Sequence, residues 1–189
     1  KAAGYSVPSG LLDPALEYIS SKANSWYSTH NAESVSVQAY RLYDLALAKK
    51  SNLGAMNRLA SMKDINNNGI YLISAAYLLS GNSDYAKEIM EKSKDFKEYR
   101  YTGASFNSST REVAMRLLTY TLLNDERKAA VYAKKVCGIL NDDKWLSTQE
   151  TAWCLMTLLP YYTKQAADRS SWTSESNGEK RENVLKHTS

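Results

Sequence analysis

The sequence is poor in the residues that break regular structure. It has only three prolines and eight glycines in 189 residues, and only two phenylalanines. A β-rich fold needs many tight turns, and glycine and proline supply most of them, so this composition argues against such a fold. Hydrophobic residues nevertheless make up 43% of the chain, which is enough to form a substantial core in a single domain.

Cysteine and histidine are also scarce. Cys137 and Cys154 are too few for a disulfide scaffold, and they lack the paired Cys-x-x-Cys spacing of a zinc site. Because both lie in apolar segments with helical periodicity, we expect buried free thiols; a bridge between neighbouring helices is the alternative. His30 and His187 have no nucleophile or metal ligand close in the sequence, and a Cys–His pair could form only through the fold. We therefore assign no catalytic and no metal-binding residue.

Neither charge nor hydropathy indicates a nucleic acid or a membrane as a partner. The formal net charge is only +4, and the basic residues form no stripe that would follow phosphate groups. No apolar run approaches the roughly 20 residues that span a bilayer. No glycine-rich loop suits a phosphate, so we expect no cofactor. The chain begins at Lys1 without methionine or a signal-peptide pattern, which leads us to expect a longer parent protein that continues upstream.

Hydrophobic periodicity and helix stop signals predict eight helices. They span residues 11–27, 34–49, 52–62, 67–80, 83–95, 109–124, 126–140 and 147–166. After residue 167 the composition shifts to serine, glutamate, lysine and asparagine. Such a segment can bury little apolar surface, so we expect residues 168–189 to be a polar linker or a disordered tail.

A repeat of about 38 residues organises these helices. It is marked by Ala39, Ala76, Ala114 and Ala152, which follow one another at spacings of 37, 38 and 38 residues. The second, fourth, sixth and eighth helices are apolar almost all round, whereas the third, fifth and seventh carry one apolar stripe. A helix that is apolar on every side has to be buried on every side. We therefore predict an all-α fold in which residues 1–167 form part of an α/α toroid, with helical hairpins in two layers.

Serines are expected to begin three of the enclosed helices. Ser34, Ser109 and Ser147 each stand five residues before a repeat alanine, and serine is a favoured N-cap residue. Glu112 and Glu150 follow the last two serines by three residues. This spacing predicts two capping boxes. In each, the serine hydroxyl group accepts from an amide of the first turn, and the glutamate carboxylate accepts from the amide of the capping serine.

The same glutamates are also the strongest candidates for catalysis. Glu33, Glu112 and Glu150 lie near the same ends of the enclosed helices. In (α/α) barrel enzymes that act on polysaccharides, carboxylates at the mouth of the barrel serve as general acid and base. We favour capping, because the Ser-x-x-Glu spacing accounts for two of the three residues without any chemistry.

Two groups of aromatic residues offer further alternatives. Residues 95–107 form a long connection that holds Tyr99, Tyr101 and Phe106 beside Arg100. Such a loop either recognises a partner or covers the ends of the helix layers, and we favour the second interpretation. The tyrosines of the enclosed helices could line a sugar-binding cleft, but we expect them in the core with their hydroxyl groups at its edge.

The last predicted helix is expected to be enclosed like its counterparts. Pro160 is expected to end or kink it. The residues that should form its buried wall are Trp153, Cys154, Leu155, Met156, Leu158 and Leu159.

Four segments look familiar when they are taken together and in order. They are GYSVPSGLLDPALEYI (4–19), QAYRLYDLALAKKSNLGAMNRL (38–59), GASFNSSTREVAM (103–115) and LSTQETAWCLMTLL (146–159). The last resembles a W-x-S-T-Q-E-T-A-W-A-L segment of the bacterial alpha-2-macroglobulin family, and the first resembles that family's G-Y-x-V-P followed by a helix. The other two are similar to its A-Y-x-L-Y-x-L-A and S-x-x-R-(D/E)-x-A patterns. The resemblance implies the C-terminal part of the thioester domain, which in that family is an α/α toroid.

The resemblance also implies a function. Members of this family are large envelope proteins that trap proteases: cleavage of a bait region triggers a conformational change, and a thioester in a Cys-x-Glu-Gln motif captures the attacker. Neither Cys137 nor Cys154 stands in such a motif, so no thioester residue is assigned to this chain.

We therefore expect a non-catalytic module of a protease inhibitor in the bacterial periplasm or cell envelope, whose parent could be lipid-anchored. Its partners would be the proteases that the full-length parent traps and the other domains of that parent. The alternatives are a fragment of an (α/α) barrel enzyme that acts on polysaccharide, and a helical-repeat scaffold that binds partner proteins.

Overall fold

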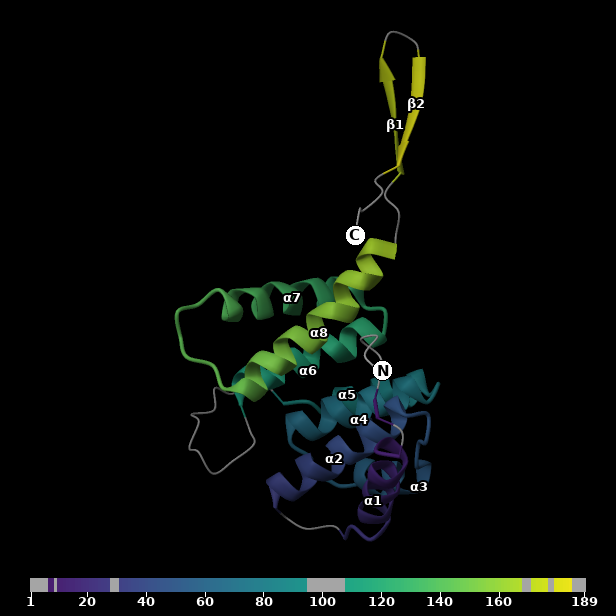
Figure 1. The fold of residues 1–189 in the computed structure, drawn as a ribbon, viewed down its shortest axis with the longest axis vertical. Helices are drawn as coiled ribbons and strands as arrows, with labels where there is room; N and C mark the ends of the chain where they lie inside the picture. Colours follow the sequence, from purple (N-terminus) through teal and green to yellow (C-terminus); the bar gives the residue numbers. More distant parts are fainter. Residues whose placement is uncertain are drawn as a thin grey trace.

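The computed structural model describes residues 7–8, 10–27, 31–94, 108–167, 171–176 and 179–184. The helices in these ranges are α1 (Leu12–Asn24), α2 (Ala32–Leu47), α3 (Leu53–Ala60), α4 (Asn67–Leu79), α5 (Ser83–Glu91), α6 (Ser109–Leu122), α7 (Glu126–Leu140) and α8 (Thr148–Ala167) (Figure 1). All eight predicted helices are thus present in the predicted order. The loop at 95–107 and both histidines lie outside the described residues.

The helices form two layers, as the repeat predicts. The even-numbered helices make a continuous inner series, because α2 packs on α4, α4 on α6, and α6 on α8. The odd-numbered helices lie against this series: α1 on α2, α3 on α2 and α4, α5 on α4, and α7 on α6 and α8 (Figure 1). The prediction of an all-α fold of stacked helical hairpins is confirmed for this part of the chain.

Burial follows the layers in the first three inner helices. In α4 every residue from Asn67 to Tyr77 is buried, and in α6 the buried run extends from Arg111 to Thr119. The outer helices bury one stripe each, as α5 does with Ala86, Ile89 and Met90. Sequence periodicity therefore separates the two layers correctly at these helices.

The eighth helix departs from the prediction of enclosure. Trp153 and Cys154 are buried, but Leu155, Met156 and Leu159 are 57%, 54% and 58% exposed. The reason is that, among the described elements, α8 packs mainly on α6 and α7, so its outward side is left uncovered. Pro160 does not end the helix, which continues to Ala167.

Two of the three predicted N-caps are wrong by a few residues. Helix α2 is capped by Asn31, whose Oδ1 accepts from the amide of Ser34 at 3.4 Å. Helix α6 is capped by Ser108, whose Oγ accepts from the amide of Arg111 at 3.4 Å, so Ser109 is the first helical residue. Asparagine and serine cap helices about equally well. Spacing alone therefore cannot choose between neighbouring candidates.

The cysteines and the C-terminal segment agree only in part with the predictions. Both cysteines are free thiols, but Cys137 is only half-buried. Within the predicted tail, strands β1 (Ser171–Ser176) and β2 (Glu179–Val184) pair as an antiparallel sheet, which the sequence analysis does not predict. No helix among the described residues is both long and apolar enough to cross a membrane.

Candidate functional site

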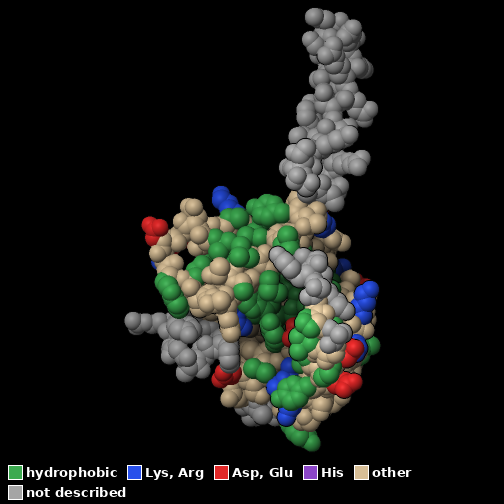
Figure 2. Space-filling model, in the orientation of Figure 1, with side chains coloured by type: hydrophobic (Ala, Val, Ile, Leu, Met, Phe, Trp, Pro, Cys, Tyr) green, Lys and Arg blue, Asp and Glu red, His purple; other side chains and the backbone are tan. Residues whose placement is uncertain are grey.

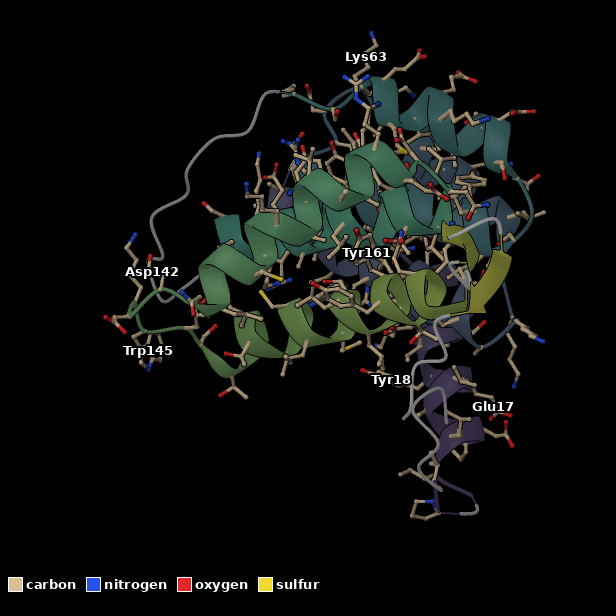
Figure 3. The ribbon with its side chains drawn as sticks, turned by 90° about the horizontal axis from the view of Figure 1, so that it is seen from above. Glu17, Tyr18, Lys63, Asp142, Trp145 and Tyr161 are labelled. Atoms are coloured by element: carbon tan, nitrogen blue, oxygen red, sulfur yellow. The ribbon has the colours of Figure 1, made fainter. Side chains whose placement is uncertain are left out.

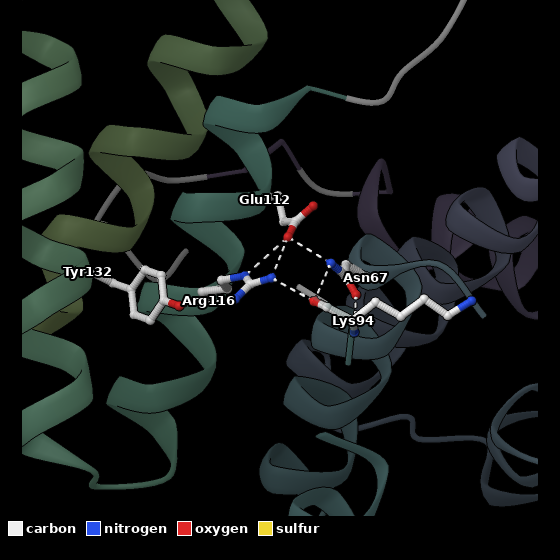
Figure 4. A network of polar contacts seen from close by, with 5 residues as sticks. All are labelled: Asn67, Lys94, Glu112, Arg116 and Tyr132. Carbon is white, nitrogen blue, oxygen red and sulfur yellow. Dashed lines mark hydrogen bonds and ion pairs between the residues drawn. The ribbon is translucent and has the colours of Figure 1, made fainter. Parts of the chain in front are cut away.

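Glu112 is a buried ion-pair partner and forms no capping box with Ser109. Its side chain is only 1% exposed, and its Oε1 atom accepts from Arg116 Nη2 at 2.6 Å and Arg116 Nε at 3.1 Å (Figure 4). Asn67 Nδ2 donates to the same oxygen at 2.9 Å. The other carboxylate oxygen, Oε2, is buried without a hydrogen-bond partner among the residues that the structure describes. The capping prediction for Glu112 is therefore wrong.

Arg116 extends this network to α7 and to the end of α5, and adds a second contact with α4. It donates to the hydroxyl group of Tyr132 on α7 at 3.0 Å and to the carbonyl of Lys94, just beyond α5, at 3.4 Å (Figure 4). Its guanidinium lies over the ring of Tyr71 on α4, 4.8 Å from the centroid. Asn67 also binds the backbone of Lys94, through both its amide nitrogen and its carbonyl oxygen. The network therefore ties α4, α6, α7 and the end of α5 together.

Glu150 confirms the capping box predicted for α8. Its Oε2 accepts from the amide and hydroxyl groups of Ser147 at 2.9 and 2.8 Å, and its own amide donates to Ser147 Oγ at 3.3 Å. Ser108 donates to Glu150 Oε1. Burial raises the pKa of the Glu150 carboxyl group, but the hydrogen bonds from Ser108 and Ser147 outweigh it and hold the pKa below its usual value. The group is therefore ionised at neutral pH and poorly suited to act as a general acid.

The three candidate glutamates each have their own partners. Glu33 is half-buried in the first turn of α2, where its amide donates to Asn31. Glu112 is held by Arg116, and Glu150 is held by serines. Within the described part of the chain, no hydrogen bond or ion pair joins any two of these carboxylates.

A cleft of about 340 Å³ opens between α2, α6 and α8. Its walls are Ser36, Val37, Tyr40 and Arg41 from α2, Arg111 from α6, and Gln149, Ala152, Trp153 and Met156 from α8. Trp153 is 6% exposed and meets Tyr40 edge-on, with ring centroids 5.9 Å apart. A volume of this size lies within the usual range of ligand sites. Apolar side chains gather over the half of the molecule that carries α8 (Figure 2).

The charged groups that line the cleft are both cations. Arg111 donates from Nη1 to Gln149 Oε1 at 3.2 Å, which links α6 to α8 across the cleft. Arg41 on α2 is half-buried and reaches Gln38 Oε1 only at 3.5 Å. Burial lowers the pKa of Arg111, although the neighbouring Tyr40 hydroxyl group and Glu150 carboxylate oppose this shift. Arg111 is therefore engaged by its neighbours, and Arg41 is the cation that a ligand in this cleft would meet.

Only one wall residue of this cleft matches a sequence-based alternative, in which tyrosines of the enclosed helices line a cleft: Tyr40 lies in its wall and is 38% exposed. Trp153 and Met156 were expected to be buried wall, and Arg111 and Gln149 were not assigned. Polar residues inside otherwise apolar helices are a usable signal, because buried polar groups need partners. Nothing in the sequence shows that α2 and α8 approach each other.

Two other surface features give no preference for one type of ligand. A second cavity, of about 410 Å³, lies between α6 and α7 and is lined by both Lys135 and Asp142. Trp145 is 78% exposed near Asp142, at the end of the α7–α8 hairpin (Figure 3). Across the ranges that the structure describes, no group of three or more His, Cys, Asp or Glu residues could hold a metal ion.

Comparisons with known proteins identify the fold. No family model matches the chain, and no curated protein sequence matches it. Among solved structures, the native conformation of Escherichia coli alpha-2-macroglobulin is similar over 98% of this chain, with a TM-score of 0.63 and 18% identity. Trypsin-activated alpha-2-macroglobulin from the same organism also matches over 98%, with a TM-score of 0.60 and 20% identity. A native E. coli structure that spans domain MG7 to the C-terminus is similar over 98% of this chain, with a TM-score of 0.63 and 18% identity.

These comparisons support the alpha-2-macroglobulin resemblance at the level of the fold. The chain spans 12%, 14% and 30% of the three matched chains. It is therefore similar to one segment of a much larger protein, and that segment lies between domain MG7 and the C-terminus.

Proposed function

We propose that the chain is a non-catalytic module of a bacterial, envelope-associated protein that traps proteases as alpha-2-macroglobulins do. The observation behind the proposal is the fold match over 98% of this chain to E. coli alpha-2-macroglobulin, of which it spans only 12%. The matched structures include forms activated by porcine elastase and by trypsin. The module would correspond to the late hairpins of the thioester toroid.

The exposed face of α8 supports the view that further protein surrounds this module. Leu155, Met156 and Leu159 are each more than half exposed on a helix whose pattern is typical of a buried one. A run of large apolar side chains on a surface usually marks an interface. Other segments of a longer protein would cover it.

The contacts of the two best-placed carboxylates support a role without catalysis. Glu112 is committed to Arg116 and Glu150 to Ser147, so each carboxylate already serves the fold. Burial raises the pKa of the Cys154 thiol to about 11, which keeps it protonated and unreactive. If the trap is covalent, the thioester would therefore come from another part of the longer protein.

Capture of active trypsin tests the proposal. The longer protein that contains this chain is incubated with trypsin and separated by gel filtration. The matched control is trypsin whose active-site serine has been blocked with phenylmethylsulfonyl fluoride. A trap that closes after bait cleavage should retain active trypsin in its own elution peak and should not retain the blocked enzyme.

Pretreatment with methylamine, which destroys thioesters, separates the two kinds of trap. Loss of capture after methylamine indicates a covalent trap, and unchanged capture indicates a non-covalent one. Elution of active trypsin entirely apart from the protein would contradict the proposal. Turnover of polysaccharide that Glu112→Gln and Glu150→Gln abolish, with the fold intact, would establish the enzyme alternative in its place.

A further inference from the structure

Helix α7 carries most of the net positive charge of the chain. Its one acid is Glu126 and its four cations are Arg127, Lys128, Lys134 and Lys135, so its net charge is +3. The rest of the chain, with 20 of the 24 cations and 19 of the 20 acids, adds only +1. The sequence analysis does not predict this concentration, because a net charge of +4 averages over the whole chain.

The four cations lie on the solvent side of α7, and we call this surface the basic face. Successive residues of a helix turn by about 100°, so residues seven apart lie nearly in line, about 10.5 Å from each other along the axis. Arg127 and Lys134 form one such row, and Lys128 and Lys135 form a second beside it. All four are exposed, and Val131, between the rows, is 51% exposed. The other side of α7 packs on α6 and α8.

Acids of the chain compensate little of the charge on the basic face. Of its four cations only Lys128 has an acidic partner among the described residues, Asp125 at 3.7 Å, and the Lys128 side chain is still 60% exposed. Exposed ion pairs of this kind contribute little, so an external anion can compete for Lys128. Arg127 and Lys134 form no ion pair or side-chain hydrogen bond within the described part of the chain. The basic face therefore has cations to offer to an external anion.

An apolar cavity opens at the C-terminal end of the basic face. It is the cavity of about 410 Å³ between α6 and α7, and Lys135 of the basic face is part of its lining. Its other lining residues are Val113, Tyr132, Gly138, Ile139 and Asp142. A side chain added at Gly138 would meet no atom within 4 Å, so the cavity is open to solvent there. The charge of Asp142 is balanced by Lys144 at 3.3 Å, which leaves Lys135 as the cation beside an apolar space.

A basic face next to an apolar cavity fits the surface of a membrane that contains anionic lipids. Clusters of four or more Lys and Arg residues on an amphipathic helix are attracted to anionic headgroups. A lipid also has an apolar part, for which the cavity beside Lys135 provides a place. A nucleic acid duplex would meet the cations too, but phosphates line its outer surface and gain nothing from an apolar cavity. The exposed side of α7 has no aromatic ring on which unpaired bases could stack.

We propose that the basic face of α7 binds the surface of a membrane rich in anionic lipids. In this arrangement α7 lies parallel to the membrane, and lipid headgroups face its two rows of cations. The inference concerns the 189-residue chain itself. It does not depend on whether a longer protein traps proteases.

Sedimentation with vesicles provides the test. The 189-residue chain is mixed with vesicles of phosphatidylglycerol and phosphatidylcholine in equal parts, or of phosphatidylcholine alone. At 0.15 M salt, the anionic vesicles should bind the chain at least tenfold more tightly than the neutral ones. At 1 M salt, where the screening length falls to about 3 Å, this preference should disappear.

Two charge-matched double variants locate the site. Arg127→Gln with Lys134→Gln removes one row of the basic face, and Lys22→Gln with Lys63→Gln removes two exposed cations elsewhere. Lys22 lies on α1 and Lys63 just after α3, at the opposite end of the helical body from α7 (Figure 1). Glutamine is a good helix former, so circular dichroism should show both variants folded.

The first variant should bind anionic vesicles at least tenfold more weakly than wild type, because each cation near such a surface accounts for about fivefold in affinity. The second should stay within twofold of wild type. Equal binding to the two kinds of vesicle, or equal losses in the two variants, would overturn the proposal. Binding to a DNA duplex that persists in an excess of anionic vesicles would assign the basic face to nucleic acid instead.

Discussion

Truncation of the buried carboxylate of Glu112 is expected to be the most damaging single polar substitution in the described structure. Glu112→Ala removes the acceptor of three hydrogen bonds, two from Arg116 and one from Asn67. It also leaves the Arg116 side chain, which is only 9% exposed, without its counter-ion. Removal of one partner of a buried ion pair costs about 3–5 kcal/mol, because the remaining charge is not compensated.

Urea unfolding, followed by circular dichroism at 222 nm, measures this loss in the free energy of unfolding. In a thermal scan, the same loss lowers the melting temperature of a domain of this size by roughly 10 °C. Glu17→Ala is the matched control, because Glu17 is exposed on α1 and points away from the helices (Figure 3). That substitution should change the free energy of unfolding by less than about 0.5 kcal/mol.

A second substitution separates loss of charge balance from loss of packing. Glu112→Leu alone leaves the charge of Arg116 without its counter-ion, whereas Glu112→Leu combined with Arg116→Met removes both charges. Well-packed apolar residues can replace a buried ion pair at little cost. The double variant should therefore be more stable than Glu112→Leu by at least about 1 kcal/mol. An alanine variant within about 1 kcal/mol of wild type, or no recovery in the double variant, would refute the buried network.

Three further predictions concern the cap of α8, a partly buried acid and the exposed helix face. Ser147→Ala should lower the free energy of unfolding by about 0.5–2 kcal/mol in urea titrations, because it breaks the capping box with Glu150; a smaller loss would argue against the box. Burial raises the pKa of Asp44 from 3.8 to about 6, so its ionisation disfavours the folded state as the pH rises through this window. The free energy of unfolding of Asp44→Asn, relative to wild type, should therefore grow from pH 4 to pH 7. A difference that stays constant over this range would contradict the prediction. Leu159→Ser should change stability by less than about 0.5 kcal/mol, while Leu117→Ala at a fully buried position should cost about 2–5 kcal/mol; equal losses would mean that α8 is enclosed after all.

Features that depend on neighbours along the chain could be predicted from the sequence. Helix positions follow from periodicity, and the separation of inner from outer helices follows from apolar residues on all sides or on one side. The capping box of Ser147 and Glu150 was predictable because both partners belong to one turn. The cap of α6 was misplaced by one residue, since Ser108 and Ser109 are chemically equivalent candidates.

Features that depend on contacts across the fold could not be predicted. Glu112 has the same local spacing as Glu150, yet its carboxylate binds Arg116, four residues later on the same helix. Asn67 also reaches it, because α4 packs against α6 at that point, and the sequence does not show this packing. The exposure of Leu159 depends on what covers α8, which its own sequence does not reveal. The cleft requires Trp153 to meet Tyr40 from a helix more than a hundred residues earlier.

The ratio of two trypsin activities tests the central claim most directly. After incubation with the proposed longer protein, trypsin is assayed on casein and on a small chromogenic peptide. A protease enclosed in a trap keeps its active site but cannot reach large substrates. The account predicts that cleavage of casein falls while cleavage of the peptide is retained. Unchanged activity on both substrates, at an excess of the longer protein, would contradict the account.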